Sequence, residues 1–133
     1  MRLLVTGAGA DGLSFLESVR DIDTTGTDAL WESAQWPPGA LPAAAAAFYD
    51  NSPPPGVLQW KVATFPPDHD IPPHFTASID LDCVVAGAVT LGLTDGAHAL
   101  GVGDCVVVRG VGHRWTTGPE GVTMLIVRVG TAP

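Results

Sequence analysis

The sequence predicts an all-β fold, an antiparallel sandwich or barrel, on two observations. From residue 56 onward, short runs rich in Val, Ile and Thr follow one another between Gly, Asp and Pro, with no long helical pattern among them. The dipeptide Asp95-Gly96 stands between two such runs and is typical of a hairpin turn. At 133 residues the chain has the size of one domain, so we expect a single domain over 1–133 with its barrel core at 56–133.

The first 55 residues are predicted to form an N-terminal extension that contains a hairpin and a short helix. Residues 3–19 contain the spacing G-x-G-x-x-G, which is typical of dinucleotide-binding folds when a helix and a second parallel strand follow. The stretch "TTGTDALWES" that follows is no buried strand. We therefore interpret "LLVT" and "LSFLESV" as two strands joined by a glycine-rich turn, and we expect no nucleotide cofactor.

The rest of the extension is rich in residues that break regular structure. Only "LPAAAAAFY", residues 41–49, has the composition of a short helix, with Pro42 acceptable in its first turn. Trp31 and Trp36 are expected to anchor the segment to the barrel, or alternatively to line a ligand cavity. A packing role is expected for Tyr49.

Charge and composition restrict the partners that we expect. The net charge is −8, and the 6 Lys and Arg residues are scattered, which argues against nucleic acid and anionic membrane. No apolar run approaches the length of a membrane span and no secretory signal is recognised, so a cytoplasmic protein is expected. Cys83 and Cys105 lie in apolar runs without a C-x-x-C partner; we expect reduced thiols, with a disulfide or a reactive thiol as the alternatives.

The residues that could carry chemistry lie in two of the strand-like runs. Because side chains alternate between the faces of a strand, His74, Thr76, Ser78 and Asp80 would share one face of the first run if its pairing continues unbroken. In the second run His113 and Trp115, two positions apart, are predicted to lie on the same face. If both faces line one barrel interior, two imidazoles and a carboxylate converge on an apolar cavity.

These runs resemble the cupin superfamily of small double-stranded β-helix (jelly-roll) barrels. "HFTASIDLDCVVAG" is similar to the first cupin motif, and "GDCVVVRGVGHRW" to the second, one residue shorter than the general pattern. Both are closest to a subgroup of small cupins with H-x-T-x-T-I-D and G-D-V-V-V-Q-R-G-x-x-H-x-W. The resemblance covers about residues 56–130 and implies a cupin barrel and, by analogy alone, a homodimer.

The resemblance also implies a metal site that this chain matches only in part. Cupin metal sites use three His and one Glu, whereas this chain offers His74, Asp80 and His113, with Thr76 in place of the second His. Two imidazoles and a carboxylate can still hold one divalent metal, Fe, Mn, Ni or Zn. Without a metal, His74 and His113 would act as general acid and base, with Asp80 orienting one ring or taking the proton itself.

Other side chains have both a binding and a structural interpretation. Thr76 is a candidate for substrate binding. Arg109 either meets a substrate carboxylate or forms an ion pair with Asp80 or Asp82, and Trp60 and Trp115 either stack on a planar ligand or pack in the core. His69 and His98 are expected to lie outside the site.

Three functions remain open from the sequence. The preferred one is a lyase, isomerase or cyclase that acts by His/Asp acid–base chemistry on a small, mostly apolar oxygenated metabolite, polyketide-like or aromatic, with no obligatory metal. The reaction would be a cyclisation, dehydration, decarboxylation or isomerisation. The alternatives are a metal-dependent dioxygenase or decarboxylase and a non-catalytic protein that binds a small ligand.

Overall fold

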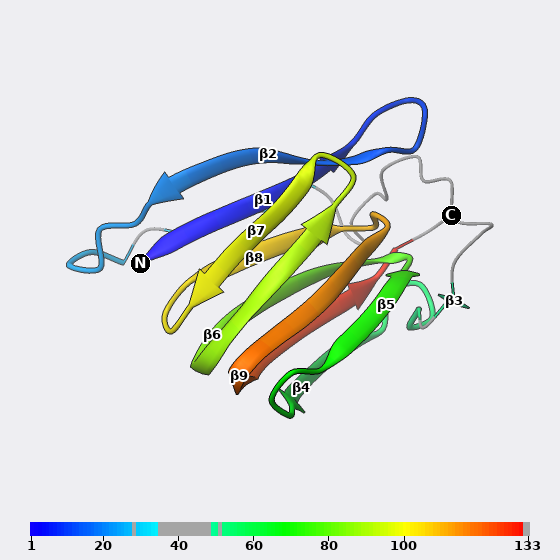
Figure 1. Cartoon of the computed structure of the whole chain (residues 1–133). Helices are drawn as coiled ribbons and strands as arrows, with labels where there is room; N and C mark the ends of the chain where they lie inside the picture. Colours follow the sequence, from blue (N-terminus) through cyan, green and yellow to red (C-terminus); the bar gives the residue numbers. More distant parts are fainter. Residues whose placement is uncertain (28, 35–48, 51, 132–133) are drawn as a thin grey trace.

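In the computed structural model, which describes residues 1–27, 29–34, 49, 50 and 52–131, the chain is built from strands (Figure 1). The strands are β1 Arg2–Ala8, β2 Ser14–Asp21, β3 Tyr49–Asp50, β4 Leu58–Phe65, β5 Asp70–Phe75, β6 Ser78–Leu93, β7 Gly96–Gly101, β8 Cys105–Arg109 and β9 His113–Gly130. Within the described residues there is no helix, and hence none long and apolar enough to cross a membrane. The helix expected over 41–49 lies outside the described residues except for Tyr49, and so does Trp36.

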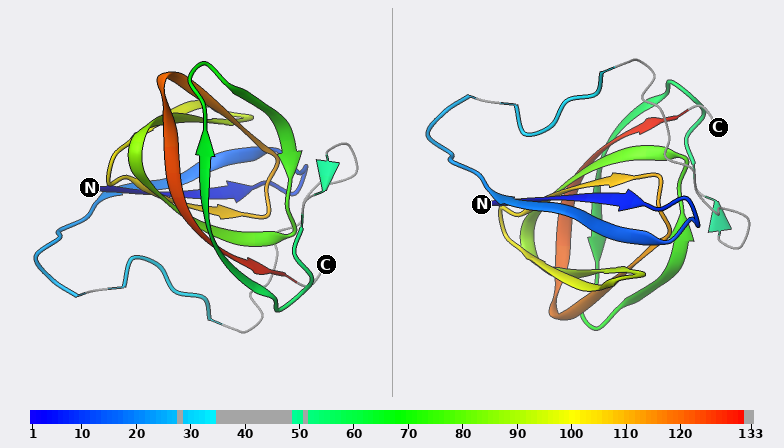
Figure 2. Two further views of the ribbon diagram at one scale, coloured as in Figure 1. Left: turned by 90° about the horizontal axis from the view of Figure 1, so that it is seen from below. Right: turned by 90° about the horizontal axis from the view of Figure 1, so that it is seen from above.

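The strands form one mixed sheet in the order β2-β1-β8-β6-β9-β5-β3, and β4 and β7 pair with β9 and β6 outside this path. Figure 2 shows how the sheet curls around an interior. β6 and β9 are the longest strands, and each pairs with different neighbours along its two halves. The predicted antiparallel barrel-like architecture is therefore confirmed, with two parallel pairings in addition, β1 with β8 and β3 with β5.

Two glycines allow β6 and β9 to bend sharply past each other. Gly87 and Gly121 have positive φ angles of 71° and 64°. A Cβ atom on Gly87 would lie 2.2 Å from the Gly121 carbonyl oxygen, and one on Gly121 would lie 2.7 Å from the Phe65 carbonyl oxygen. Only glycine tolerates both the backbone conformation and this approach, so the register shifts in β6 between Val84 and Val89 occur here.

The N-terminal hairpin is confirmed and belongs to the barrel sheet. β1 pairs antiparallel with β2, and the turn is closed by a hydrogen bond of 3.0 Å from the Gly9 amide to the Leu13 carbonyl. β1 also runs parallel to β8, with Leu3 opposite Cys105. The expected extension thus supplies a strand of the sheet, because its apolar run Leu3–Val5 is buried there.

Apolar side chains fill one part of the interior. The main cluster contains Leu4, Val84, Val89, Leu91, Leu100, Val106, Val108, Val111, Trp115, Val122, Met124 and Ile126. A second cluster around Leu3, Val5 and Val107 is covered by Trp31, as expected for an anchor. The predicted hairpin turn is also present: Leu93 pairs with Gly96 around Thr94 and Asp95.

The two cysteines are opposite each other on β6 and β8 and are free thiols. Burial raises the pKa of the Cys105 thiol to about 12, which keeps it protonated and unreactive.

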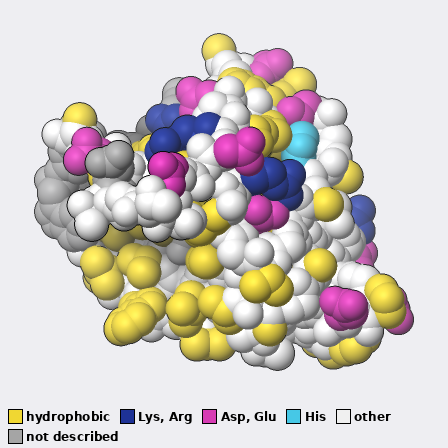
Figure 3. Space-filling view, turned by 90° about the vertical axis from the view of Figure 1, so that its left-hand side faces the viewer, with side chains coloured by type: hydrophobic (Ala, Val, Ile, Leu, Met, Phe, Trp, Pro, Cys, Tyr) yellow, Lys and Arg dark blue, Asp and Glu magenta, His cyan; other side chains and the backbone are white. Residues whose placement is uncertain are grey.

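The outer surface of the barrel carries apolar as well as charged side chains. On the face in Figure 3, hydrophobic side chains gather in the lower part, while acidic and basic side chains mix above them. Along β4 the outward residues Leu58, Trp60 and Val62 are 56%, 75% and 62% exposed. The inward residues of the same strand alternate with them, and Lys61, Ala63 and Phe65 face a cavity in the barrel interior.

Candidate functional site

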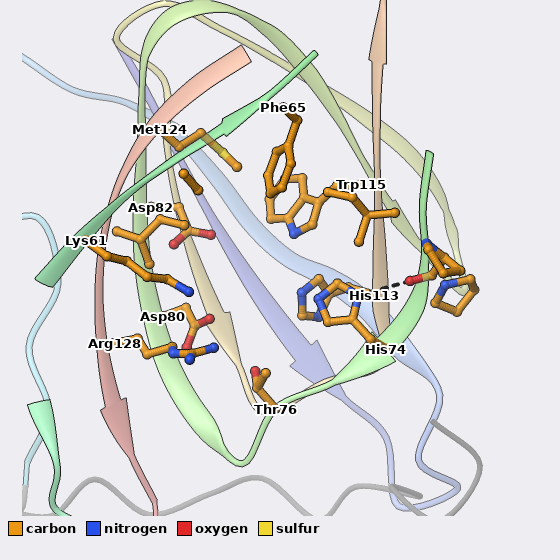
Figure 4. Close-up of a pocket in the computed structure, with 15 residues that line it drawn as sticks. Lys61, Phe65, His74, Thr76, Asp80, Asp82, His113, Trp115, Met124 and Arg128 are labelled. Atoms are coloured by element: carbon orange, nitrogen blue, oxygen red, sulfur yellow. Dashed lines mark hydrogen bonds between the residues drawn. The ribbon is translucent and has the colours of Figure 1, made fainter. Parts of the chain in front are cut away.

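The barrel interior holds a cavity of about 340 Å³ between strands β4, β5, β6 and β9 (Figure 4). A cavity of this size lies within the range of small-molecule sites. Its apolar lining includes Phe65, Ile71, Trp115, Met124 and Ile126. Its polar lining comprises Lys61, His74, Thr76, Asp80, Asp82, His113 and Arg128.

Two histidines from neighbouring strands form one polar end of the cavity. His74 on β5 pairs in register with His113 on β9, and their ring centroids are 4.2 Å apart. His74 Nδ1 donates to the Pro72 carbonyl at 3.0 Å, and His113 Nδ1 donates to the Val111 carbonyl at 2.8 Å. A carbonyl oxygen only accepts, so each Nδ1 carries a proton and each Nε2 of a neutral ring has a free lone pair.

The two rings differ in how deeply they are buried. His113 is buried, and this burial lowers its pKa to about 3, with the neighbouring His74 acting in the same direction. His113 is therefore neutral near pH 7 and serves as a hydrogen-bond acceptor. His74 is only half-buried, so its ring has access to solvent. The Trp115 ring packs edge-on against His113, at a centroid distance of 5.8 Å.

Asp80 lies across the cavity from the histidines (Figure 4). Its side chain is buried and accepts a short hydrogen bond from the Ser78 hydroxyl. Burial raises the pKa of Asp80, against the opposing effects of Ser78 and Arg128. Within the described residues Asp80 makes no hydrogen bond to either imidazole, and main-chain carbonyls hold both rings at Nδ1.

Three further charged side chains line the same side of the cavity, and the sequence analysis did not single them out as a group. Across β4, β9 and β6, Lys61, Ile126 and Asp82 form one row in register. Gln59, Arg128 and Asp80 form the next row, and Arg128 Nε donates to Gln59 Oε1 at 2.9 Å. The signal was present in the alternation of "LQWKVATF", whose inward positions include Gln59 and Lys61.

Two buried polar atoms of the cavity wall have no hydrogen-bond partner. They are Thr76 Oγ1 and Asp82 Oδ1, in side chains that are 2% and 5% exposed. Because an unpaired buried polar atom costs free energy, a site that leaves two of them facing a cavity is suited to a polar ligand. This places Thr76 where the sequence predicted a substrate contact.

Two of the predicted binding residues lie elsewhere, and the structure corrects both. Trp60 points outward from β4 and is 75% exposed, because the strand's pairing with β9 turns Lys61 to the inside. Arg109 Nη1 forms an ion pair with Glu17 at 2.6 Å, on the N-terminal hairpin, and meets neither Asp80 nor Asp82. His69 and His98 are outside the cavity as expected, and His98 pairs with Asp95 at 2.9 Å.

A divalent metal fits the described residues poorly. Within the part of the chain that the structure describes, no group of three or more His, Cys, Asp or Glu residues is arranged to hold a metal ion. His74 and His113 are adjacent, whereas Asp80 faces them from the opposite strand (Figure 4).

Comparison with protein-family models and with curated proteins gives no match. Among solved structures, a Rhizobium leguminosarum protein of unknown function is 16% identical, with a TM-score of 0.52 over 55% of this chain and 70% of its own. The Cnp3 cupin domain of Schizosaccharomyces pombe is 16% identical, with a TM-score of 0.51 over 55% of this chain and 52% of its own. The polyketide cyclase RemF of Streptomyces resistomycificus is 27% identical, with a TM-score of 0.50 over 53% of both chains. The match thus spans about half the length of the last two proteins.

Proposed function

We propose that this chain, which has the cupin fold, is a small enzyme that moves protons on a mostly apolar, oxygenated metabolite. The common step is enolisation, the removal of a proton from a carbon next to a carbonyl group. Cyclisation, dehydration and isomerisation next to a carbonyl group can proceed through such an enol or enolate, and decarboxylation of a β-keto acid releases CO₂ and leaves the same enol, which is then protonated on carbon. No metal is required for this step.

The observation that carries the proposal is the histidine pair. Both rings have Nδ1 bonded to the main chain, so both present a free Nε2 lone pair. Holding the reacting groups in place in advance is a large part of what an enzyme contributes to a proton transfer.

The proton transfer needs a base on one side of the cavity and an acid on the other. The Nε2 atom of His74 takes the proton from carbon, and the bonding pair becomes the C=C bond of the enol. Burial raises the pKa of Asp80, which favours a protonated carboxyl that donates to the carbonyl oxygen. Neutral His113 accepts a hydrogen bond from a substrate hydroxyl and fixes the substrate's orientation.

The substrate class follows from the lining and from one of the comparisons. Phe65, Trp115 and Met124 offer flat, apolar surfaces to a ring system. The resemblance to RemF, described as a polyketide cyclase, supports polyketide-like or aromatic substrates.

The proposal is tested with 2-tetralone, a bicyclic ketone whose α-protons exchange on enolisation. In D₂O, followed by proton NMR, the protein should accelerate exchange above free imidazole at equal concentration. His74→Gln should lower the rate about 100-fold, within the range of general base catalysis. The matched control is His69→Gln, which removes an exposed imidazole outside the cavity and should retain the wild-type rate.

Two outcomes would replace the proposal by one of the alternatives. Stoichiometric metal in untagged protein, together with exchange that a chelator abolishes, would favour a metal-dependent dioxygenase or decarboxylase. Binding of 2-tetralone without exchange above the imidazole control would favour a non-catalytic ligand-binding protein.

A further inference from the structure

The geometry points to Lys61 and Arg128 as a clamp for an anionic oxygen of the ligand, so that the cavity selects flat, apolar molecules bearing a carboxylate or an enolate. This inference deepens the proposed function, since it takes the same cavity as the substrate site. It assigns a role to the charged end of the cavity, which the proton transfer uses only through Asp80.

The two cations approach the cavity from adjacent strands. Lys61 on β4 is opposite Ile126 on β9, and Arg128 lies two residues further along β9, so both face the interior. Figure 4 shows the ends of the two side chains on the same side of the cavity, next to Asp80 and Asp82. A carboxylate there would accept from the ammonium and guanidinium groups together.

Neither cation is paired with an acid among the residues that the structure describes. None of the ion pairs in the described part of the chain joins Lys61 or Arg128 to an aspartate. The hydrogen bond of Arg128 to Gln59 uses Nε, which leaves the two terminal nitrogens for a ligand. Asp82 Oδ1, on the same wall, is buried without a partner. The charged side chains therefore border an open part of the cavity, where a polar group of a ligand would complete their hydrogen bonds.

The protonation of the two aspartates decides the charge that this space prefers. Burial raises the pKa of Asp82 well above its ordinary range, and the negative charge of Asp80 raises it further. With Asp82 protonated, the two cations face at most the one carboxylate of Asp80, and none while Asp80 carries the proton that it donates in the proposed enolisation. The remaining positive charge favours one anion, whereas a protonated Asp82 can donate to a ligand oxygen.

The apolar part of the cavity limits the size and shape of the ligand that carries the anionic group. Phe65, Trp115 and Met124 lie beyond the charged end (Figure 4), and the volume of about 340 Å³ suits one or two fused rings. The ligand class is therefore a small ring acid or an acidic enol, not a sugar or a nucleotide.

The test compares 2-naphthoate with 2-naphthamide, which has nearly the same shape but no charge, by isothermal titration calorimetry at pH 7. The acid should bind at least tenfold more tightly than the amide. Lys61→Met should reduce the affinity for 2-naphthoate about tenfold, the loss expected for one charge-assisted hydrogen bond, and leave that for the amide unchanged. Arg109→Met is the matched control, because it removes a cation outside the cavity, and it should change neither affinity.

A second readout follows from the composition, because Lys61 is the only lysine of the chain. Acetylation of Lys61 by acetic anhydride, measured by mass spectrometry of the peptide, should be slowed by 2-naphthoate and not by 2-naphthamide. Equal affinities for acid and amide, no binding of either at millimolar concentration, or an unchanged affinity in Lys61→Met would overturn the inference. Because these measurements involve no turnover, they are independent of whether 2-tetralone exchanges.

Discussion

The two polar ends of the cavity are held in place by different means. At the histidine end, each ring donates to the main-chain carbonyl two residues earlier, Pro72 within β5 for His74 and Val111 just before β9 for His113. At the charged end, Lys61, Asp82 and Arg128 come from three strands and are not joined to one another by ion pairs. The first arrangement is local, whereas the second exists only when β4, β6 and β9 are in register.

The two ends also respond to pH in opposite directions. Burial disfavours the charged form of every group, but the charged form is the protonated one for His113 and the ionised one for Asp82. Acid therefore destabilises the fold through the histidine end, and base destabilises it through the charged end.

The largest effect is expected from His113. Its folded pKa of about 3 lies below the ordinary value of 6.5, so the unfolded chain binds the extra proton and stability falls as the pH drops from 6.5 towards 3. Lowering the pH from 7 to 4.5 should reduce the free energy of unfolding by about 2 to 3 kcal/mol through this group. His113→Gln cannot titrate, and its amide can still donate to Val111. Urea unfolding of both proteins at the two pH values measures the difference, and equal pH slopes would contradict this account.

A smaller effect of opposite sign is expected from Asp82. Its folded pKa is raised, so the folded chain binds the extra proton and stability falls as the pH rises above about 4. At pH 8 the free energy of unfolding of Asp82→Asn, measured with urea, should therefore exceed that of wild type by about 1 kcal/mol. This gain should shrink towards pH 4. The exposed Asp70→Asn is the control, with no such gain expected. A loss of stability in Asp82→Asn at pH 8 would mean that the carboxylate is paired.

The smallest effect on the cavity is expected from Trp60, which lies on the outer face of β4. Trp60→Ser should leave 2-tetralone exchange within about twofold of the wild-type rate, since the ring does not line the cavity.

The homodimer expected from the family resemblance stays a prediction, and the exposed row Leu58, Trp60 and Val62 is its candidate interface. Light scattering should then give a dimer for wild type and a smaller mass for the variant. A lost exchange activity with an unchanged mass would place Trp60 in the site after all.

Several features were predictable because they depend on neighbours in sequence. Alternation within β9 placed His113 and Trp115 on one face, and both line the cavity. The run predicted to carry His74, Thr76 and Asp80 on one face is divided instead, because β5 ends at Phe75 and β6 begins at Ser78, so these residues line the cavity from two strands and the turn between them. The glycine-rich turn after β1 was also predictable, since the chain that follows lacks a second parallel strand. Trp60 was misplaced because alternation fixes which residues share a face but not which face is inside.

The sequence alone therefore determined the strand pattern, the hairpin turns and the residues of the histidine end, all of which rest on local periodicity and spacing. Only the tertiary structure decided that Lys61 and Arg128 face the cavity with Asp82, and that Arg109 pairs with Glu17 on the N-terminal hairpin. The cause is register. Pairing of β4 and of β6 with β9 aligns Lys61 and Asp82 on either side of Ile126, and pairing of β1 with both β2 and β8 brings Glu17 to Arg109. A shift by one residue would turn these side chains to the opposite face.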